Sequence, residues 1–405
     1  MSRIALLATL DTKSDEARFV ADTIRARGHT PWVVDLSLRP GGTLAADVSR
    51  VAIASAAATT TSAVEQLQRA RAMEVIVSGA AVLVRSAVER AEMQAVIAIG
   101  GGTGTWMGTA IMRQLSIGFP KLMVSTLTGR DATTDIMVMP SVADIAGLNK
   151  LLVPILANAA NAVCGMVEAS APTFEQNKPL IAMTMFGVTT AGGTHVRRFL
   201  EDAGCEVVVF HANGSGGATM EDLVRRGVFA GVLDWTTSEV TDELTGGICT
   251  AGPTRLEAAG AVGIPQLVIP GAVDVINVRG EIPKRFAKRI YHMHLPTVPL
   301  IRTSVQESRQ IGTWIGDKLN RATGPVRVLI PGGGYSALDV AGGPFWDPDA
   351  NDAFVSALQR KLRKDIPVHI DPHHINDKAF ARVAAEMLLD MTIGTSATSR
   401  VLVEA

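Results

Sequence analysis

The chain has 405 residues, a formal net charge of -1 and 47% hydrophobic residues. One hydrophobic core serves about 250–300 residues, so this length predicts two domains. The balanced charge disfavours a general nucleic-acid binder, which needs a basic surface. No apolar run approaches the ~20 residues of a membrane-spanning helix. Three widely spaced cysteines without a CxxC pattern indicate a reducing compartment, and we expect a cytoplasmic protein.

The first half alternates apolar segments with helical patterns. Buried parallel strands are continuously apolar, so such segments predict strands, each leading into a helix. The expected elements are a strand within 3–10, a helix over 15–27, strands at 31–36 and 95–99, a helix over 106–115, a strand at 121–125, and a helix that begins near Ser141 as its cap.

Polar residues follow the first strand directly. In open parallel sheets, ligands bind beyond the carboxyl ends of the strands. We therefore expect Asp11, Thr12 and Lys13 to contact a ligand, with Lys13 supplying a positive charge to phosphate. The alternative is that Lys13 is an ordinary solvated loop lysine.

A glycine-rich turn after the strand at 95–99 is the most informative motif. Its glycines let the backbone approach a ligand, and the helix that follows directs its unpaired N–H groups at the turn, which favours phosphate. The Gly-Lys-Ser/Thr ending of a Walker A loop is missing. A plain strand-to-helix turn is the alternative. The predicted phosphate contacts are Gly101, Gly102, Thr103, Gly104 and Thr105.

Small hydroxylated residues follow the strand at 121–125. Ser125 and Thr126 are expected at the same sheet edge as the glycine turn. Asp144 and Asn149 could face the ligand as well, although a position on a helix surface is an equal alternative for each.

The second half repeats the pattern of the first. Residues 179–190, 206–210, 229–233 and 266–270 correspond to the strands and turns described above, which suggests duplication of a βαβαβ unit. The segment 168–179 has the proline and polar content of a linker. We expect an α/β protein with two Rossmann-like lobes and mainly parallel sheets, over 1–172 and 179–405.

Carboxylates and a second glycine turn mark the ends of strands in this half. Asp234, Glu239, Asp242 and Glu243 could bind Mg²⁺ or transfer protons, or favour the start of a helix near Ser238. Asp234 is the preferred catalytic candidate. The second glycine turn repeats the first, so we expect substrate contacts from Gly332, Gly333, Gly334 and Ser336.

Histidines and aspartates gather near the C-terminus. Asp371, His373, His374 and Asp377 could ligate a metal or form an acid–base pair, and we take His374 and Asp377 as catalytic candidates. The spacing matches no zinc signature, which leaves the metal unknown. Alternatively, Asp377 caps the helix predicted over 378–389.

Eight motifs occur in one order along the chain, at residues 10–16, 99–105, 141–149, 234–237, 243–247, 251–258, 342–345 and 374–377. This series resembles the ATP-binding domain family of the tomato mosaic virus resistance protein and its bacterial and fungal relatives. The resemblance covers nearly the whole chain.

The resemblance implies two Rossmann-like lobes, ATP binding with Mg²⁺ in the first half, and a homodimer. It assigns the nucleotide to Asp11, Thr12, Lys13, Gly101–Thr105, Ser125, Thr126 and Asn149. In plants the domain precedes a barrel-like domain, so a separate barrel-type enzyme is a possible partner here.

Three functional hypotheses follow. The first is an ATP-dependent enzyme acting on a small metabolite, with phosphates at Gly100–Thr105 and the metabolite in the second half. The second is a nucleotide-gated binding or regulatory protein without turnover. The third is a hydrolase or isomerase that uses Asp234, His374 and Asp377.

Overall fold

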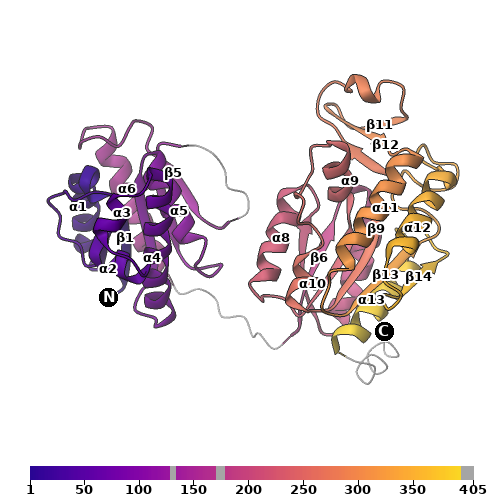
Figure 1. The fold of residues 1–405 in the computed structure, drawn as a ribbon, viewed down its shortest axis with the longest axis horizontal. Helices are drawn as coiled ribbons and strands as arrows, with labels where there is room; N and C mark the ends of the chain where they lie inside the picture. The colour runs from indigo at the N-terminus through magenta and orange to yellow at the C-terminus, as the bar shows by residue number, and fades with distance from the viewer. Residues whose placement is uncertain (128–133, 170–177, 394–405) are drawn as a thin grey trace. The chain divides into compact units, whose positions relative to one another are not determined.

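The computed structural model describes residues 1–127, 134–169 and 178–393. The chain forms two compact units, Met1–Phe174 and Glu175–Ala405 (Figure 1). Within the predicted linker, residues 170–177 lie outside the described part of the chain. Each unit contains a parallel sheet with helices packed on it, so the predicted α/β class with two lobes is confirmed.

The first unit has a five-stranded sheet in the order β2-β1-β3-β4-β5, and all neighbouring strands are parallel. Its elements are β1 (Arg3–Ala8), α1 (Leu10–Ala26), β2 (Thr30–Asp35), α2 (Arg50–Ala56), α3 (Thr61–Glu65), α4 (Arg69–Glu89), β3 (Ala95–Gly100), α5 (Gly102–Met112), β4 (Lys121–Ser125), β5 (Met137–Pro140) and α6 (Leu152–Glu168).

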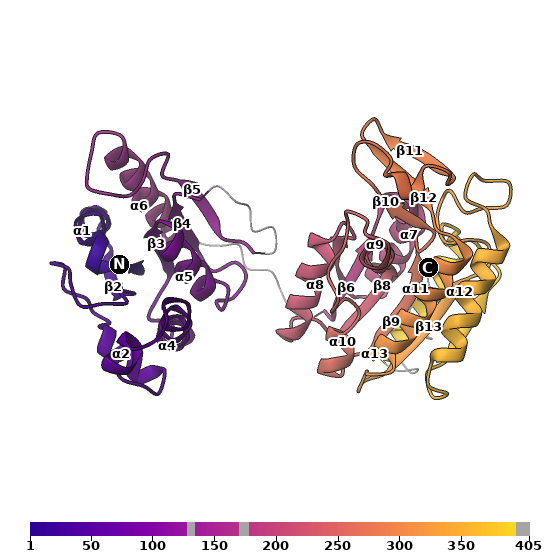
Figure 2. The ribbon, with the colours of Figure 1, turned by 45° about the horizontal axis from the view of Figure 1, so that its top comes forward.

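Helices cover both faces of this sheet (Figure 2). Side chains alternate along a strand, so Ile4 and Leu6 of β1 pack toward α1 and α6, while Ala5 and Leu7 pack toward α2, α4 and α5. Both faces are therefore apolar. This is why the strands of this unit are continuously hydrophobic in sequence.

Three predicted helix boundaries in the first unit are wrong. Helix α1 begins at Leu10 and α5 at Gly102, each directly after its strand. No helix begins at Ser141: its hydroxyl donates to the Ala143 carbonyl instead, and α6 starts only at Leu152. The reason is a turn at Val142, whose φ of +64° is left-handed and incompatible with an α-helix.

The second unit has a six-stranded sheet in the order β14-β13-β9-β8-β6-β7, again with parallel neighbours. A smaller antiparallel sheet has the order β10-β12-β11. The elements are β6 (Leu180–Met185), α7 (Thr190–Asp202), β7 (Glu206–His211), α8 (Ser215–Arg225), β8 (Gly231–Thr236), α9 (Ser238–Thr245), α10 (Ala258–Val262), β9 (Gln266–Gly271), β10 (Val275–Asn277), β11 (Tyr291–Leu295), β12 (Val298–Arg302), α11 (Val305–Leu319), β13 (Val326–Pro331), α12 (Pro348–Lys361), β14 (Val368–Asp371) and α13 (Lys378–Ile393), with short 3₁₀ turns at Gly187–Thr189 and Lys284–Phe286.

The two large sheets share one strand order. Counted from the first strand of each unit, both follow 2-1-3-4-5, and the second unit adds a sixth strand at the β14 edge. The sequence pattern matched β1 to β6 and β3 to β8, and the strands of each match occupy equivalent positions in their two sheets. This is the arrangement that a duplicated unit would give.

No helix among those that the structure describes has the length and apolar character needed to cross a bilayer.

Candidate functional site

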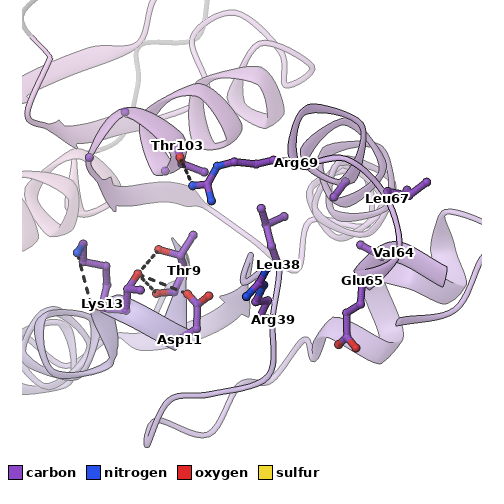
Figure 3. Close-up of a pocket in the computed structure, with 15 residues that line it drawn as sticks. Thr9, Asp11, Lys13, Leu38, Arg39, Val64, Glu65, Leu67, Arg69 and Thr103 are labelled. Atoms are coloured by element: carbon purple, nitrogen blue, oxygen red, sulfur yellow. Dashed lines mark hydrogen bonds between the residues drawn. The ribbon is translucent and has the colours of Figure 1, made fainter. Parts of the chain in front are cut away.

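A pocket of about 330 Å³ lies at the carboxyl edge of the first sheet. From β1 the chain moves to β2 on one side and then returns to β3 on the other side of β1. The connections leaving β1 and β3 therefore diverge and leave a crevice, which is the usual ligand position in open α/β sheets. Residues from both connections and from the segment between β2 and β3 line the pocket, namely Thr9, Asp11, Thr12, Lys13, Leu38, Arg39, Val64, Glu65, Leu67, Arg69, Ala72, Gly101, Gly102, Thr103 and Gly104 (Figure 3).

The start of α5 forms one wall of this pocket. The N–H groups at the first positions of a helix have no partner within the helix, and together with the helix dipole they favour an anion. A side chain on Gly102 would meet no atom within 4 Å, so packing does not require glycine there. By contrast, a Cβ on Gly100 would lie 2.6 Å from Gly104 Cα, so Gly100 is needed for the turn itself.

The connection after β1 is fixed by the one after β2. The buried Asp35 carboxylate accepts a hydrogen bond from the Ser37 hydroxyl, and Ser37 in turn accepts the Asp11 N–H at 2.9 Å. The Ser14 hydroxyl donates to the Leu10 carbonyl at 2.6 Å and accepts the Thr43 N–H at 2.9 Å. These bonds hold Asp11 and its neighbours at the pocket edge.

Three cationic side chains line the pocket: Lys13, Arg39 and Arg69. Arg69 reaches from the first turn of α4 to Thr103, with its Nη2 2.8 Å from the Thr103 hydroxyl (Figure 3). Within the described chain, neither Lys13 nor Arg39 makes an ion pair. Of the two lining carboxylates, Glu65 is already paired with Arg50 at 2.7 Å. The pocket is therefore suited to a negatively charged ligand.

The structure separates the predicted nucleotide contacts into two groups. Asp11, Thr12, Lys13 and Gly101–Gly104 line the pocket. The other four do not line it: Thr105, Ser125, Thr126 and Asn149. The Thr105 and Ser125 hydroxyls hydrogen-bond to each other at 2.8 Å and link the first turn of α5 to the end of β4.

Asn149 is used to begin a helix. Its side-chain oxygen accepts the N–H groups of Leu151 and Leu152, both at 3.0 Å, at the start of α6. Thr126 lines a neighbouring hollow. In this structure Thr105, Ser125 and Asn149 hydrogen-bond within the protein and do not line the pocket, and their ligand contacts stay predictions.

Arg39 and Arg69 were missed in the sequence. Arg39 follows β2 at the same sheet edge, so examining the residues after every strand would have found it. Arg69 lies at the start of a helix between β2 and β3, and no local pattern distinguishes it from other surface arginines. Its position depends on how α4 packs.

The second glycine turn, after β13, differs from the first. Its N–H groups are already bonded: Gly332 to the Asp371 carbonyl, Gly333 to the His373 carbonyl and Gly334 to the Pro331 carbonyl. A Cβ on Gly333 would lie 2.5 Å from the His374 nitrogen. Close packing of the backbone therefore explains these glycines, and their N–H groups are not free for an anion. The substrate contacts predicted for Gly332, Gly333, Gly334 and Ser336 gain no support.

The prediction that Asp234 lies at a strand tip is wrong. Asp234 lies inside β8, which continues to Thr236. Its side chain is fully buried and lies 2.6 Å from Nη2 of the fully buried Arg255. Arg255 also contacts Glu239 at 2.8 Å and Glu221 at 3.2 Å. Burial raises the pKa of both glutamates above the usual range, while the arginine opposes that shift. This buried ion cluster connects α8, β8, α9 and the segment before α10.

The predicted pair His374 and Asp377 is held by backbone contacts. The Asp377 carboxylate accepts the His374 N–H at 2.9 Å, and the Asp377 carbonyl accepts the Ala381 N–H at 3.1 Å, so the residue lies at the start of α13. His374 Nδ1 accepts the Asn376 N–H, so Nε2 carries the proton and donates to the Ser336 carbonyl at 2.8 Å. No hydrogen bond or ion pair joins either residue to Asp234. The Asp234 carboxylate instead forms an ion pair with Arg255 and accepts a hydrogen bond from the Gln266 side chain.

Protein metal sites are built mainly from histidine, cysteine, aspartate and glutamate side chains. Within residues 1–127, 134–169 and 178–393, no three of these side chains form a group that could hold a metal ion. A metal bound entirely by protein ligands is therefore not indicated in the described part of the chain. Mg²⁺ bound mainly through a ligand's phosphates does not require such a group.

Asp274 provides a pH-dependent stability prediction. It is buried in the second unit and accepts the Ser336 hydroxyl at 2.7 Å; burial, followed by the nearby Asp339, raises the pKa of Asp274 to about 7. Because the folded state binds this proton more tightly than the unfolded state, protonation of Asp274 stabilises the fold. This stabilisation is complete below about pH 4 and is lost as the pH rises to 7. Relative to wild type, Asp274→Asn should gain about 3 kcal/mol of unfolding free energy between pH 4.5 and 7.5.

Urea titrations at several pH values measure this difference. Asp349→Asn, at a surface position on α12, is the control and should keep a constant offset from wild type. A constant offset for Asp274→Asn as well would show that Asp274 titrates normally.

Sequence comparisons agree with the two-unit architecture. Residues 2–172 match the N-terminal domain, and residues 178–392 the C-terminal domain, of the uncharacterised protein family UPF0261. A UPF0261 protein of Clostridium tetani is 41% identical over 401 residues, covering 96% of this chain and 98% of that protein.

A relative from tomato and one solved structure complete the comparison. The ToMV susceptible protein tm-1(GCR26) of Solanum lycopersicum is 34% identical over 96% of this chain, which spans 56% of that longer protein. The comparison with the solved structure of the glycosyltransferase SnogD from Streptomyces nogalater covers 96% of this chain and 98% of the SnogD chain, at 14% identity and a TM-score of 0.21. Neither a shared fold nor a shared function follows from a score at this level. The resemblance predicted from the motifs is confirmed: the chain belongs to the UPF0261 family, which includes the tomato protein and its bacterial relatives.

Proposed function

We propose that the first unit binds a nucleotide through its phosphates, and that the nucleotide is ATP accompanied by Mg²⁺. The observation that carries the proposal is the open start of α5 within a cation-lined pocket. There the Gly102–Gly104 N–H groups are available to phosphate oxygens, and Gly102 leaves room for them. Arg69 and Lys13 would neutralise the phosphates from two sides.

Other walls of the pocket are apolar. Leu38, Val64, Leu67 and Ala72 provide apolar surface beside the charged groups. Binding sites for small molecules combine mostly apolar walls with a few well-placed polar groups. Adenine as the base remains an expectation from the family resemblance.

Mg²⁺ fits this pocket as an ion shared with the ligand. Asp11 is the lining carboxylate that has no cationic partner within the described chain. Mg²⁺ usually retains waters and is held by one or two carboxylates together with phosphates. When bound, it would offset phosphate charge, and Asp11 would orient it or a water that it carries.

Two functions are compatible with this site. The first is an ATP-dependent enzyme that acts on a small metabolite. The second is a nucleotide-gated binding protein without turnover. The second is favoured because, among the described residues, no histidine or cysteine lines the pocket and its two carboxylates are Asp11 and the ion-paired Glu65. Phosphate release above a buffer blank would favour the enzyme, and its absence with every metabolite tested would favour gating.

Calorimetric titration of ATP with Mg²⁺ tests the binding proposal. Arg69→Ala should weaken affinity about tenfold, because it removes one charge-assisted contact. The control is Arg71→Ala, two residues along α4, where the side chain pairs with Glu74 at 2.6 Å away from the pocket. Equal affinities of both variants would contradict the site, and a folded wild type that binds neither ATP nor tripolyphosphate would contradict the function.

A further inference from the structure

A second hollow adjoins the phosphate pocket along the start of α5. Its volume is about 520 Å³, and it shares Gly101 and Gly102 with the first pocket. The shared glycines form a low ridge, because a side chain on either would add bulk between the two spaces. The remaining walls come from the connections after β4 and β5, namely Thr126, Pro140, Val142, Ala143 and Asp144.

The chemistry of this hollow is opposite to that of the first pocket. Among the residues that the structure describes, Asp144 is the one charged residue that lines it, and this side chain is exposed; no cation of that part of the chain lines the hollow. Within the described chain, the Asp144 carboxylate and the Thr126 hydroxyl have no hydrogen-bond partner. A carboxylate without a cation repels phosphate, but it accepts hydrogen bonds from neutral hydroxyl groups.

Both oxygens lie beside the glycine ridge. A Cβ built on Gly101 would be 3.8 Å from Thr126 Oγ1 and 3.9 Å from Asp144 Oδ1. Those distances leave Gly101 unconstrained by packing, as for Gly102. A ligand lying over the ridge would thus place one end on the cations and its middle beside Asp144.

We propose that Asp144, assisted by Thr126, binds the ribose diol of the nucleotide whose phosphates lie at Gly102–Gly104. The inference rests on the proposed function. The two ribose hydroxyls donate to the carboxylate, and the apolar Pro140 and Val142 contact the carbon face of the sugar. The phosphate chain extends over the ridge toward Lys13 and Arg69.

The test combines a variant with a modified ligand. ATP, 2′,3′-dideoxy-ATP and tripolyphosphate are titrated calorimetrically into wild type and Asp144→Ala. We expect dideoxy-ATP to bind wild type about tenfold more weakly than ATP, and Asp144→Ala to weaken ATP by a similar factor. In Asp144→Ala the two nucleotides should bind equally, because the partner of the diol is already gone. Tripolyphosphate should bind the variant at least as tightly as wild type.

Asp22→Ala is the control, since Asp22 is exposed on α1 and pairs with Arg25 outside both hollows. It should leave all three affinities unchanged. The inference is overturned if Asp144→Ala binds ATP like wild type, or if the variant still prefers ATP over dideoxy-ATP tenfold. Failure of wild type to bind ATP and tripolyphosphate would instead contradict the proposed function, so the two failures are distinguishable.

Discussion

Gly102→Val should weaken ATP binding about 100-fold while the protein stays folded. The valine methyl groups would occupy the space in which phosphate oxygens approach the first N–H groups of α5. Loss of two charge-assisted hydrogen bonds of about 1.5 kcal/mol each corresponds to roughly this factor. Folding should be retained, because a Cβ at Gly102 meets no atom within 4 Å and the residue does not require a left-handed conformation.

Gly165→Val is a matched control for this substitution. Gly165 is also a helical glycine with no atom within 4 Å of a built Cβ, but it lies in α6, outside the pocket. Titration calorimetry measures affinity, and circular dichroism verifies that both variants are folded. Wild-type affinity in Gly102→Val would show that the phosphates do not bind at the start of α5.

Arg255→Ala should destabilise the second unit by about 3–5 kcal/mol, the usual cost of breaking a buried ion pair. The substitution leaves Asp234, Glu221 and Glu239 buried without their shared cation. Burial disfavours the charged form of Arg255, but the three carboxylates outweigh this effect and raise its pKa above the usual value. The arginine is therefore charged at every pH at which the protein is folded.

The pH dependence identifies the cause of this loss. Burial already raises the pKa of Glu221 and Glu239, and without Arg255 both should protonate more readily. The destabilisation measured by urea titration should therefore be smaller at pH 5 than at pH 8. Arg197→Ala, which removes an exposed pair with Glu201, is the control and should cost less than about 1 kcal/mol. A loss of similar size at both pH values would indicate missing volume, not uncompensated charge.

These expectations bear on the catalytic assignment of Asp234. In the sequence, Asp234 follows an apolar run and resembles a reactive carboxylate at a strand end. In the structure it is an ion-pair partner of Arg255 with no exposed surface. The motif at 251–258, which helped to identify the family, contains that arginine, so part of the family signature is explained by folding of the second unit.

The sequence by itself determined the class of fold and the family, and it located the glycine turn at which we propose an anion site. Strands buried on both faces are mostly apolar, so β1, β3 and β9 could be located without a structure. The glycine turn before α5 was equally local, because its chemistry depends on neighbouring residues and the helix that follows them.

Tertiary structure decided which of the candidate residues share a site. Only packing shows that Gly102 is open whereas Gly333 touches His374, although the two turns look alike in sequence. Arg69 reaches Thr103 because α4 packs beside α5, and Asp234 meets Arg255 because a later segment folds over β8. Contacts of this kind join residues far apart in the chain, and local composition and spacing contain no information about them.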